Sequence, residues 1–385
     1  MCNTPELCAE VTLQPLRRYP SLDGVVIFSD ILIICQAMGM EVIMNPGPIF
    51  PKPITVPEDI NNLILQPNCD EAFAKLYEGI TLTRNLAAST VRSVPVIGFC
   101  GAPWTLMNYM LDEPKINKTT TSTTPTSTPT TTSSSVLPPP PLPSKEKDKA
   151  HIWLYQYPEA SHKLLKAISN ICIELLIGQY KAGASILQVF ESNGGDLPPS
   201  LYKEYGLPYI KYIAEEVRKR VPSIDNQGPP LIIFPRNIHN TEIIEELCNS
   251  SYNMISIDWN WNPTDIINII QTTCAKLNKK PLGIQGNLDP IALHAPKPVL
   301  IKEIYTMLKS MYTDIHNPSQ YIPIIGNLGH GMSPSHQPEQ LGVFFDTIHV
   351  ISEELRKNKN YILTNDELEK LINKVGITMN IPLSY

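Results

Sequence analysis

Short apolar runs rich in β-branched residues recur along this chain and alternate with longer segments of helical periodicity. Seven such runs span residues 24–31, 94–101, 185–192, 231–236, 254–259, 281–287 and 321–327. Their near-continuous hydrophobicity is typical of strands that are buried on both faces of a sheet. Between the runs, apolar residues recur at steps of three and four, as from Leu164 to Leu175 and from Ile210 to Val217, which indicates amphipathic helices. This alternation predicts an α/β fold with a parallel sheet and crossover helices.

Two architectures fit this alternation, a closed barrel of eight βα units and an open, doubly wound sheet. The open sheet usually carries a glycine-rich phosphate-binding turn after an early strand, and neither GxGxxG nor GxxxxGK[ST] follows any of the apolar runs. We therefore expect a (β/α)8 TIM barrel in which seven strands are recognisable. The eighth strand is either one that the pattern misses, for which the interval 31–94 is a candidate although it reads as a loop and then a helix, or a strand that would precede the helix predicted over 5–20.

Composition and charge exclude several classes of protein. The formal net charge of -6 comes without clusters of Lys and Arg, so we expect no nucleic-acid partner. No apolar run is long enough to span a membrane and no signal-peptide pattern opens the chain, which favours a cytoplasmic protein without a membrane partner. The eight cysteines contain no CxxC and the histidines form no ligand set, so we expect free thiols and no metal site.

One segment has a composition of its own. Residues 117–149 consist of a Thr/Ser/Pro-rich tract and a short run of charged residues. Such a tract has no apolar periodicity with which to offset the entropy of ordering. We therefore expect a single domain over 1–385 that contains a disordered insertion at 117–149; an O-glycosylated stalk is the alternative.

Polar residues stand where several of the apolar runs end, and in barrel enzymes the residues at the carboxyl ends of the strands carry the chemistry. Asp30 interrupts an apolar stretch, so it is either a helix cap that accepts backbone N–H groups or an acceptor that faces a pocket. His330, between two glycines, is either a loop residue or a ligand contact. The candidates at these positions are Asp30, Glu191, Ser192, Arg236, Asn237, Asp258, Asn287, Asp289 and His330.

Several long strings of the sequence are specific. The strings VTLQPLRRYP, VVIFSDIL, GFCGAPWTLMNYM, QVFESNGGDLPP, GNLDP and NLGHG occur in this order. On these strings the chain resembles the uroporphyrinogen decarboxylase family, of the eukaryotic type. The resemblance covers the chain apart from the insertion and the C-terminal end.

The resemblance implies a homodimeric (β/α)8 barrel that works without a metal or an organic cofactor. It implies an enzyme of haem biosynthesis that removes the four acetate carboxyl groups of uroporphyrinogen III to give coproporphyrinogen III, in the cytoplasm or, with a transit peptide, in a plastid. Asp30 matches the catalytic aspartate, which accepts the pyrrole N–H groups of the substrate. Residues Tyr109, Ser192 and His330 match substrate-contacting groups, and Phe28, Phe99 and Phe190 match the apolar wall beside the macrocycle.

The chain departs from the family in one important respect. No string like the family's arginine-containing RQAGRYLP, which lies on or just after its first strand, is found here, and Arg17 and Arg18 belong to the shared PLRRYP string. The resemblance therefore implies that the first strand of the barrel is the missing one. Arg236 stands where relatives tend to carry lysine, and Ile238 departs from a glycine often found nearby. Two hypotheses follow: an active decarboxylase of which this sequence is an incomplete version, or a non-catalytic porphyrinogen-binding relative. Corrinoid methyltransferases, a third class with this barrel, are disfavoured because their zinc-binding His-x-Cys is missing.

Overall fold

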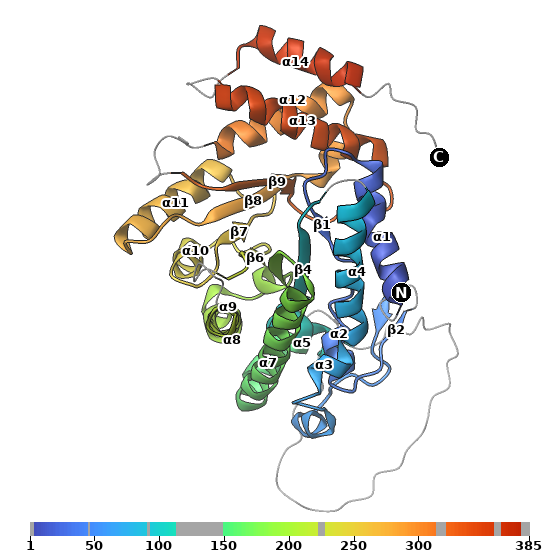
Figure 1. Cartoon of the computed structure of the whole chain (residues 1–385). Coiled ribbons are helices and arrows are strands. Elements are labelled where there is room, and N and C mark those ends of the chain that lie inside the picture. Colours follow the sequence, from blue (N-terminus) through green and yellow to red (C-terminus); the bar gives the residue numbers. More distant parts are fainter. Residues whose placement is uncertain are drawn as a thin grey trace, which may run out of the picture.

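A computed structural model describes residues 4–44, 47–90, 93–112, 149–221, 228–312, 321–357 and 363–378. Its main sheet holds seven parallel strands, each paired with the next one along the chain in the order β1-β4-β5-β6-β7-β8-β9 (Figure 1). A doubly wound sheet would reverse its order at a switch point, so the sequential order belongs to a TIM-barrel-like fold. The strands are β1 (Val25–Val26), β4 (Val96–Gly101), β5 (Ile186–Glu191), β6 (Leu231–Pro235), β7 (Met254–Ser256), β8 (Gly283–Leu288) and β9 (Ile324–Leu328). All seven predicted apolar runs are confirmed as strands.

Helices connect the strands and cover the outer face of the sheet, as the right-handed βαβ connection requires. Their apolar stripes bury against the sheet: in α7, for example, Leu164, Ile168 and Leu175 are at most 1% exposed. The helices are α1 (Pro5–Arg18), α2 (Ile33–Ala37), α3 (Cys69–Ala72), α4 (Ala74–Thr90), α5 (Pro103–Leu111), α6 (Lys149–Gln156), α7 (Pro158–Ala182), α8 (Pro199–Tyr205), α9 (Leu207–Arg220), α10 (Thr241–Cys248), α11 (Pro263–Lys276), α12 (Lys297–Met311), α13 (Pro338–Lys357) and α14 (Asn365–Thr378), with short 3₁₀ turns at Pro57–Asn62, Gly194–Asp196 and Pro290–His294.

The interval between β1 and β4 differs in one detail from the expectation of a loop and a helix. The helix is present as α4, but a small antiparallel hairpin precedes it, formed by β2 (Ile43–Met44) and β3 (Pro48–Ile49). Each strand contributes only two residues, which is too short to show the alternation that identifies a strand in a sequence. The predicted insertion at 117–149 lies outside the described residues up to 148, and Lys149 begins α6.

The two strands at the ends of the sheet, β1 and β9, each leave one edge without a partner strand among the described residues. Both edges line one cavity of about 920 Å³, to which Val26 contributes from β1 and Ile325 from β9. The interior side chains Gln188 and Phe190 line the same cavity. The curved sheet therefore encloses a barrel interior whose wall is open between β1 and β9.

Strand register decides which side chains face this interior. Phe190 pairs with Phe234, and Ser256 pairs with Gln285, and all four line the cavity. The Gln285 amide donates to the Ser256 hydroxyl at 3.1 Å. Intervening residues such as Val189, Ile233 and Ile255 are fully buried on the helix side. Because side chains alternate along a strand, residues two positions further on lie on the cavity side at the carboxyl ends of the strands.

The helices of the described residues include none that is both long and apolar enough to cross a membrane.

Candidate active site at the carboxyl ends of the strands

Asp30 lies in the loop between β1 and α2 and is half-buried. Its Oδ1 accepts a hydrogen bond from the backbone N–H of Leu32 at 2.9 Å, an Asx-type turn of the kind that short polar side chains make before a helix. This contact uses one oxygen, and no ion pair with a cation of the described residues is formed. Asp30 is therefore able to cap the turn and also to face a pocket as an acceptor, because its second carboxylate oxygen remains available to a ligand.

The negative charge of Asp30 acts on Tyr109, although the two residues belong to different βα units. Tyr109 is half-buried on α5, a helix that begins with Pro103 directly after β4. Burial, and then the negative charges of Asp30 and Asp112, raise the pKa of the Tyr109 hydroxyl. The phenol therefore stays protonated at neutral pH and is able to donate a hydrogen bond to a ligand.

Ser192 belongs to a turn that α5 holds in place. Thr105 donates its hydroxyl hydrogen to Glu191 Oε1 at 2.5 Å and accepts the backbone N–H groups of Ser192 at 2.8 Å and Asn193 at 3.3 Å. The indole N–H of Trp104 donates to the Asn193 carbonyl at 3.1 Å. The aromatic string after β4 thus positions the turn after β5. Thr105 was missed by the sequence reasoning, because a threonine inside a helix carries no signal of such a role.

Glu191 is the most strongly perturbed carboxyl group at this end of the sheet. Its side chain is completely buried, Oε2 has no hydrogen-bond partner, and burial raises the pKa of Glu191 to about 8 against the smaller, opposite effect of Thr105. A carboxyl group in this state is mostly protonated at neutral pH. Glu191 therefore acts as a neutral support for the Ser192 turn.

His330 follows β9 and is exposed at the same cavity as Phe190. Its Nδ1 lies 3.2 Å from the carbonyl oxygen of Gly331, and its ring meets the Trp259 ring edge-on at 6.0 Å between centroids. A side chain at Gly329 would place its Cβ 2.6 Å from the backbone nitrogen of Trp259, so this turn requires glycine. His330 thus lines the cavity, and among the described residues it contacts no other predicted site residue.

The aromatic side chains form a continuous wall inside the barrel. Phe99 and Phe190 contact edge to face at 5.6 Å between centroids, and Phe190 contacts Phe234 in the same way at 6.1 Å. Phe28 follows β1 by two residues and is 38% exposed, and Thr12 Oγ1 accepts its backbone N–H at 2.9 Å. Phe234 extends the predicted set of three, and only the strand register identifies it.

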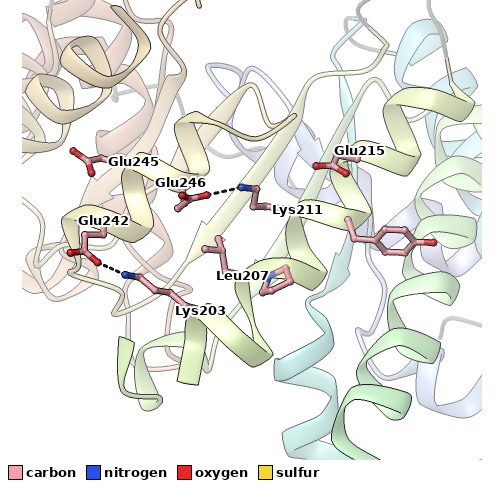
Figure 2. Close-up of a pocket in the computed structure, with 9 residues that line it drawn as sticks. Lys203, Leu207, Lys211, Glu215, Glu242, Glu245 and Glu246 are labelled. Carbon is pink, nitrogen blue, oxygen red and sulfur yellow. Dashed lines mark hydrogen bonds and ion pairs between the residues drawn. The ribbon is translucent and has the colours of Figure 1, made fainter. Parts of the chain in front are cut away.

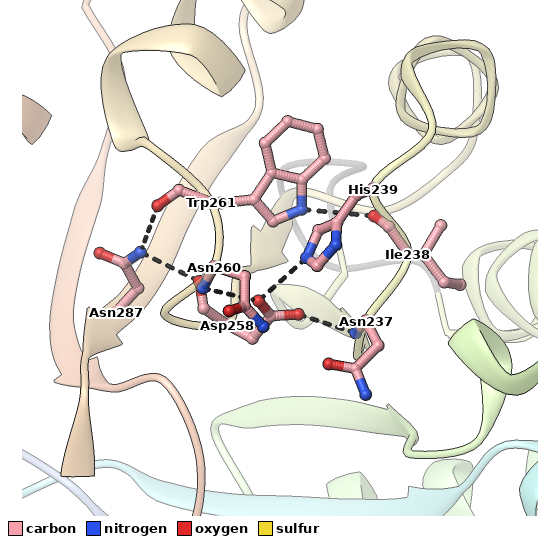
Figure 3. A network of polar contacts seen from close by, with 7 residues as sticks. All are labelled: Asn237, Ile238, His239, Asp258, Asn260, Trp261 and Asn287. Carbon is pink, nitrogen blue, oxygen red and sulfur yellow. Dashed lines mark hydrogen bonds and ion pairs between the residues drawn. The ribbon is translucent and has the colours of Figure 1, made fainter. Parts of the chain in front are cut away.

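Asp258 ties together the loops that follow β6 and β7 (Figure 3). Its buried carboxylate accepts hydrogen bonds from the backbone N–H of Asn237 at 2.7 Å and of Asn260 at 3.0 Å. The Nε2 of His239 lies 3.1 Å from Oδ1. Asn237 has a left-handed backbone with φ 57°, which asparagine tolerates. Three donors satisfy this carboxylate, so its role is to shape the loops.

Asn287 extends this network to β8. Its amide donates to the carbonyl oxygens of Asp258 at 3.0 Å and Trp261 at 2.9 Å, while the Trp261 indole N–H donates to the Ile238 carbonyl at 3.3 Å. These hydrogen bonds connect the loops that follow β6 and β7 with each other and with β8, as Figure 3 shows. Of the remaining candidates, Asp289 caps the following 3₁₀ turn by accepting the Ile291 N–H at 3.0 Å, so its contact is structural.

A second cavity, of about 690 Å³, lies on the outer surface between α8, α9 and α10 (Figure 2). Its two lysines are paired, Lys211 with Glu246 at 2.7 Å and Lys203 with Glu242, and Glu215 and Glu245 add two further carboxylates. Charges in such an open surface cleft are largely screened by water, so the interior cavity is the better candidate for chemistry. The described residues contain no cluster of three or more His, Cys, Asp or Glu that could hold a metal ion.

A parallel sheet in sequential order, with its polar groups at the carboxyl ends of the strands, defines a site of the TIM-barrel class of enzymes. A solved methyltransferase from Methanosarcina mazei shares the fold, with a TM-score of 0.59 at 16% identity over 90% of this chain and 85% of that one. At that identity the likeness concerns the fold alone.

Sequence comparison identifies the family within this class. The family described as "Uroporphyrinogen decarboxylase (URO-D)" matches residues 1–127 and 113–351, two stretches that overlap at 113–127. The chain is 38% identical to the uroporphyrinogen decarboxylase of Danio rerio (92% of this chain, 84% of the relative) and 38% identical to that of Homo sapiens (93% and 84%). The protein of that name from Salinibacter ruber is 36% identical (92% and 84%). The chain belongs to the uroporphyrinogen decarboxylase family.

Proposed function

We propose that this protein is a uroporphyrinogen decarboxylase, which converts uroporphyrinogen III to coproporphyrinogen III by removing four acetate carboxyl groups in haem biosynthesis. The observation that carries the proposal is the position of Asp30 in a chain of this family. Asp30 is half-buried after the carboxyl end of β1, and its negative charge acts on the Tyr109 hydroxyl. In this proposal the carboxylate of Asp30 meets the centre of a macrocycle that rests on the apolar wall.

The proposed reaction uses the substrate as its own electron sink. Protonation of a pyrrole carbon gives a cationic ring, and the Asp30 carboxylate accepts the pyrrole N–H groups and stabilises that charge electrostatically. The bond between the acetate methylene and its carboxylate then breaks, its electron pair moves into the ring, and carbon dioxide leaves. A proton delivered to the methylene carbon completes the methyl group, and loss of the proton first added to the ring carbon restores the neutral pyrrole.

The surrounding groups are assigned to binding. Tyr109, Ser192 and His330 offer hydrogen bonds to substrate carboxylates, and Ser192 is oriented by its clamped turn. The aromatic wall of Phe28, Phe99 and Phe190 packs against the macrocycle. Such a wall also lowers the local dielectric, which strengthens the interaction of Asp30 with a cationic ring.

The Asp30 assignment is tested by Asp30→Asn, which keeps the shape of the side chain and removes its charge. Turnover of uroporphyrinogen, assayed anaerobically, should fall about 10²-fold or more. Asp265→Asn, at an exposed position on α11, is the control and should leave turnover unchanged. Turnover of Asp30→Asn within a factor of a few of the unaltered protein would assign Asp30 to the turn alone.

A second candidate function is porphyrinogen binding without catalysis. The open wall between β1 and β9 favours it, because water that enters the barrel screens the charge of Asp30. Fluorescence titration with uroporphyrin, together with the turnover assay, separates the two functions. Binding without turnover supports the second candidate, and turnover removes it.

Four further properties belong to this proposal. A homodimer is expected and is tested by sedimentation velocity. Independence from metals and organic cofactors is expected, so turnover should persist in EDTA without additions. Location in the cytoplasm, or in a plastid of an organism that has one, is expected and is tested by imaging the tagged protein in its host. No binding to nucleic acid is expected, and a gel-shift assay tests this.

A further inference from the structure

Arg236 occupies the carboxyl end of β6, on the cavity side of the sheet. It continues the strand ladder, because its backbone N–H donates to the Glu191 carbonyl at 3.1 Å and its carbonyl accepts from Gly195 at 3.1 Å. Phe190 pairs with Phe234, and both line the cavity. Since side chains alternate along a strand, Arg236 lies beside Ser192 and on the same side of the sheet as these two phenylalanines.

The guanidinium of Arg236 has no partner among the described residues. Its Nε is buried without a hydrogen bond, and no carboxylate of the described chain lies within the 4.0 Å of an ion pair. Arginine is always charged at neutral pH, and buried charges in proteins are normally paired. A half-buried and unpaired arginine beside a cavity therefore points to an anionic ligand.

The two buried acids nearest to Arg236 along the strands do not neutralise it. The register that pairs Ile232 with Met254 brings Arg236 level with Asp258, but the Asp258 carboxylate already accepts from Asn237, Asn260 and His239. Glu191, in the neighbouring strand, is bonded to Thr105, and burial raises the pKa of Glu191 to about 8, so it is mostly neutral at pH 7. The positive charge is left for a ligand.

We propose that Arg236, together with the neighbouring Ser192, forms a subsite for one carboxylate on the rim of the substrate. The planar guanidinium suits bidentate pairing with a carboxylate, and Ser192 adds a hydroxyl donor. The subsite lies at β6, which β4 and β5 separate from β1, so a wide polycarboxylate can contact Asp30 with its centre and Arg236 with its edge. The subsite rests on the proposed function, whose substrate is such a molecule.

The test is binding of uroporphyrin I, a fluorescent octacarboxylate that needs no turnover. Quenching titrations compare the unaltered protein with R236M, R236K and R236Q, and with R220M as the control. Arg220 lies on the outer helix α9 and pairs with Glu174 at 2.8 Å. R236M should raise the Kd about tenfold or more, R236K should recover part of the loss, and R220M should change the Kd less than twofold. The difference in Kd between R236M and the unaltered protein should also become smaller as salt is added.

Each outcome bears on the subsite. Equal affinity of R236M and the unaltered protein, both folded by circular dichroism, overturns it while the proposed function stands. If R236M is destabilised, the comparison of R236K with R236Q tests the subsite instead. The subsite requires the positively charged R236K to bind uroporphyrin I more tightly than the neutral R236Q. Equal affinity of those two overturns it. Failure of the unaltered protein to bind uroporphyrin I would overturn the proposed function and this subsite together.

Discussion

Glu191 is a single residue whose protonation links the stability of this protein to pH. Burial raises the pKa of Glu191 from 4.5 to about 8 in the folded protein. The folded state therefore holds a proton that the unfolded state has released between these two values. The stabilisation is complete below pH 4.5 and is lost as the pH rises through 8, and it amounts to a few kcal/mol.

The corresponding prediction concerns Glu191→Gln, which imitates the protonated carboxyl group at every pH. The melting temperature of the unaltered protein should fall between pH 5 and pH 8.5 by several degrees more than that of Glu191→Gln. Calorimetry or circular dichroism over this range provides the measurement. Glu78→Gln, at an exposed position of α4, should follow the unaltered protein. Parallel curves for Glu191→Gln and the unaltered protein would show that Glu191 is ionised throughout.

Helix α5 positions the turn after β5 through one hydroxyl group. Thr105→Val keeps the shape of the side chain but leaves the N–H groups of Ser192 and Asn193 without their acceptor. We expect a loss of about 1–3 kcal/mol in the free energy of unfolding and a weaker affinity for uroporphyrin, because Ser192 is no longer held. Urea unfolding and fluorescence titration measure the two effects.

The matched comparison for this element is Thr83→Val in α4. Thr83 is also fully buried, and its hydroxyl donates to the Gly79 carbonyl at 2.7 Å within the helix. Its loss should destabilise the protein less and leave the affinity for uroporphyrin unchanged. An equal weakening of affinity by both variants would mean that α5 acts through general stability and has no specific hold on the turn.

The whole molecule is a curved sheet whose two outer strands face one cavity. Val26 is 48% exposed and Tyr321 is 42% exposed at that cavity, and exposed strand edges with apolar side chains promote association between chains. The protein of this sequence should therefore form species beyond a dimer as its concentration rises. Val26→Lys should suppress them in sedimentation velocity, and Val299→Lys, on α12 with 47% exposure, should not. Equal suppression by both would attribute the effect to net charge.

The pattern of apolar residues by itself determined the class of fold. The seven buried runs and the helical periods between them express contacts within an element, and such periodicity is a local property of the chain. The runs also located Asp30, Ser192 and His330 at strand ends, where barrel enzymes carry their chemistry. The two-residue strands β2 and β3 were missed because so short a pairing leaves no pattern.

Only the tertiary structure decided which of these residues act together. Several contacts join residues from different βα units. Thr105 accepts the backbone N–H of Ser192, Phe190 contacts Phe234 in the aromatic wall, and Asp258 accepts hydrogen bonds from His239 and from the backbone N–H of Asn237. The same holds for the unpaired charge of Arg236. Strand register and burial set these contacts, and both depend on segments far apart in the chain. A single sequence records the residues at the strand ends, whereas the curvature of the sheet decides which of them meet.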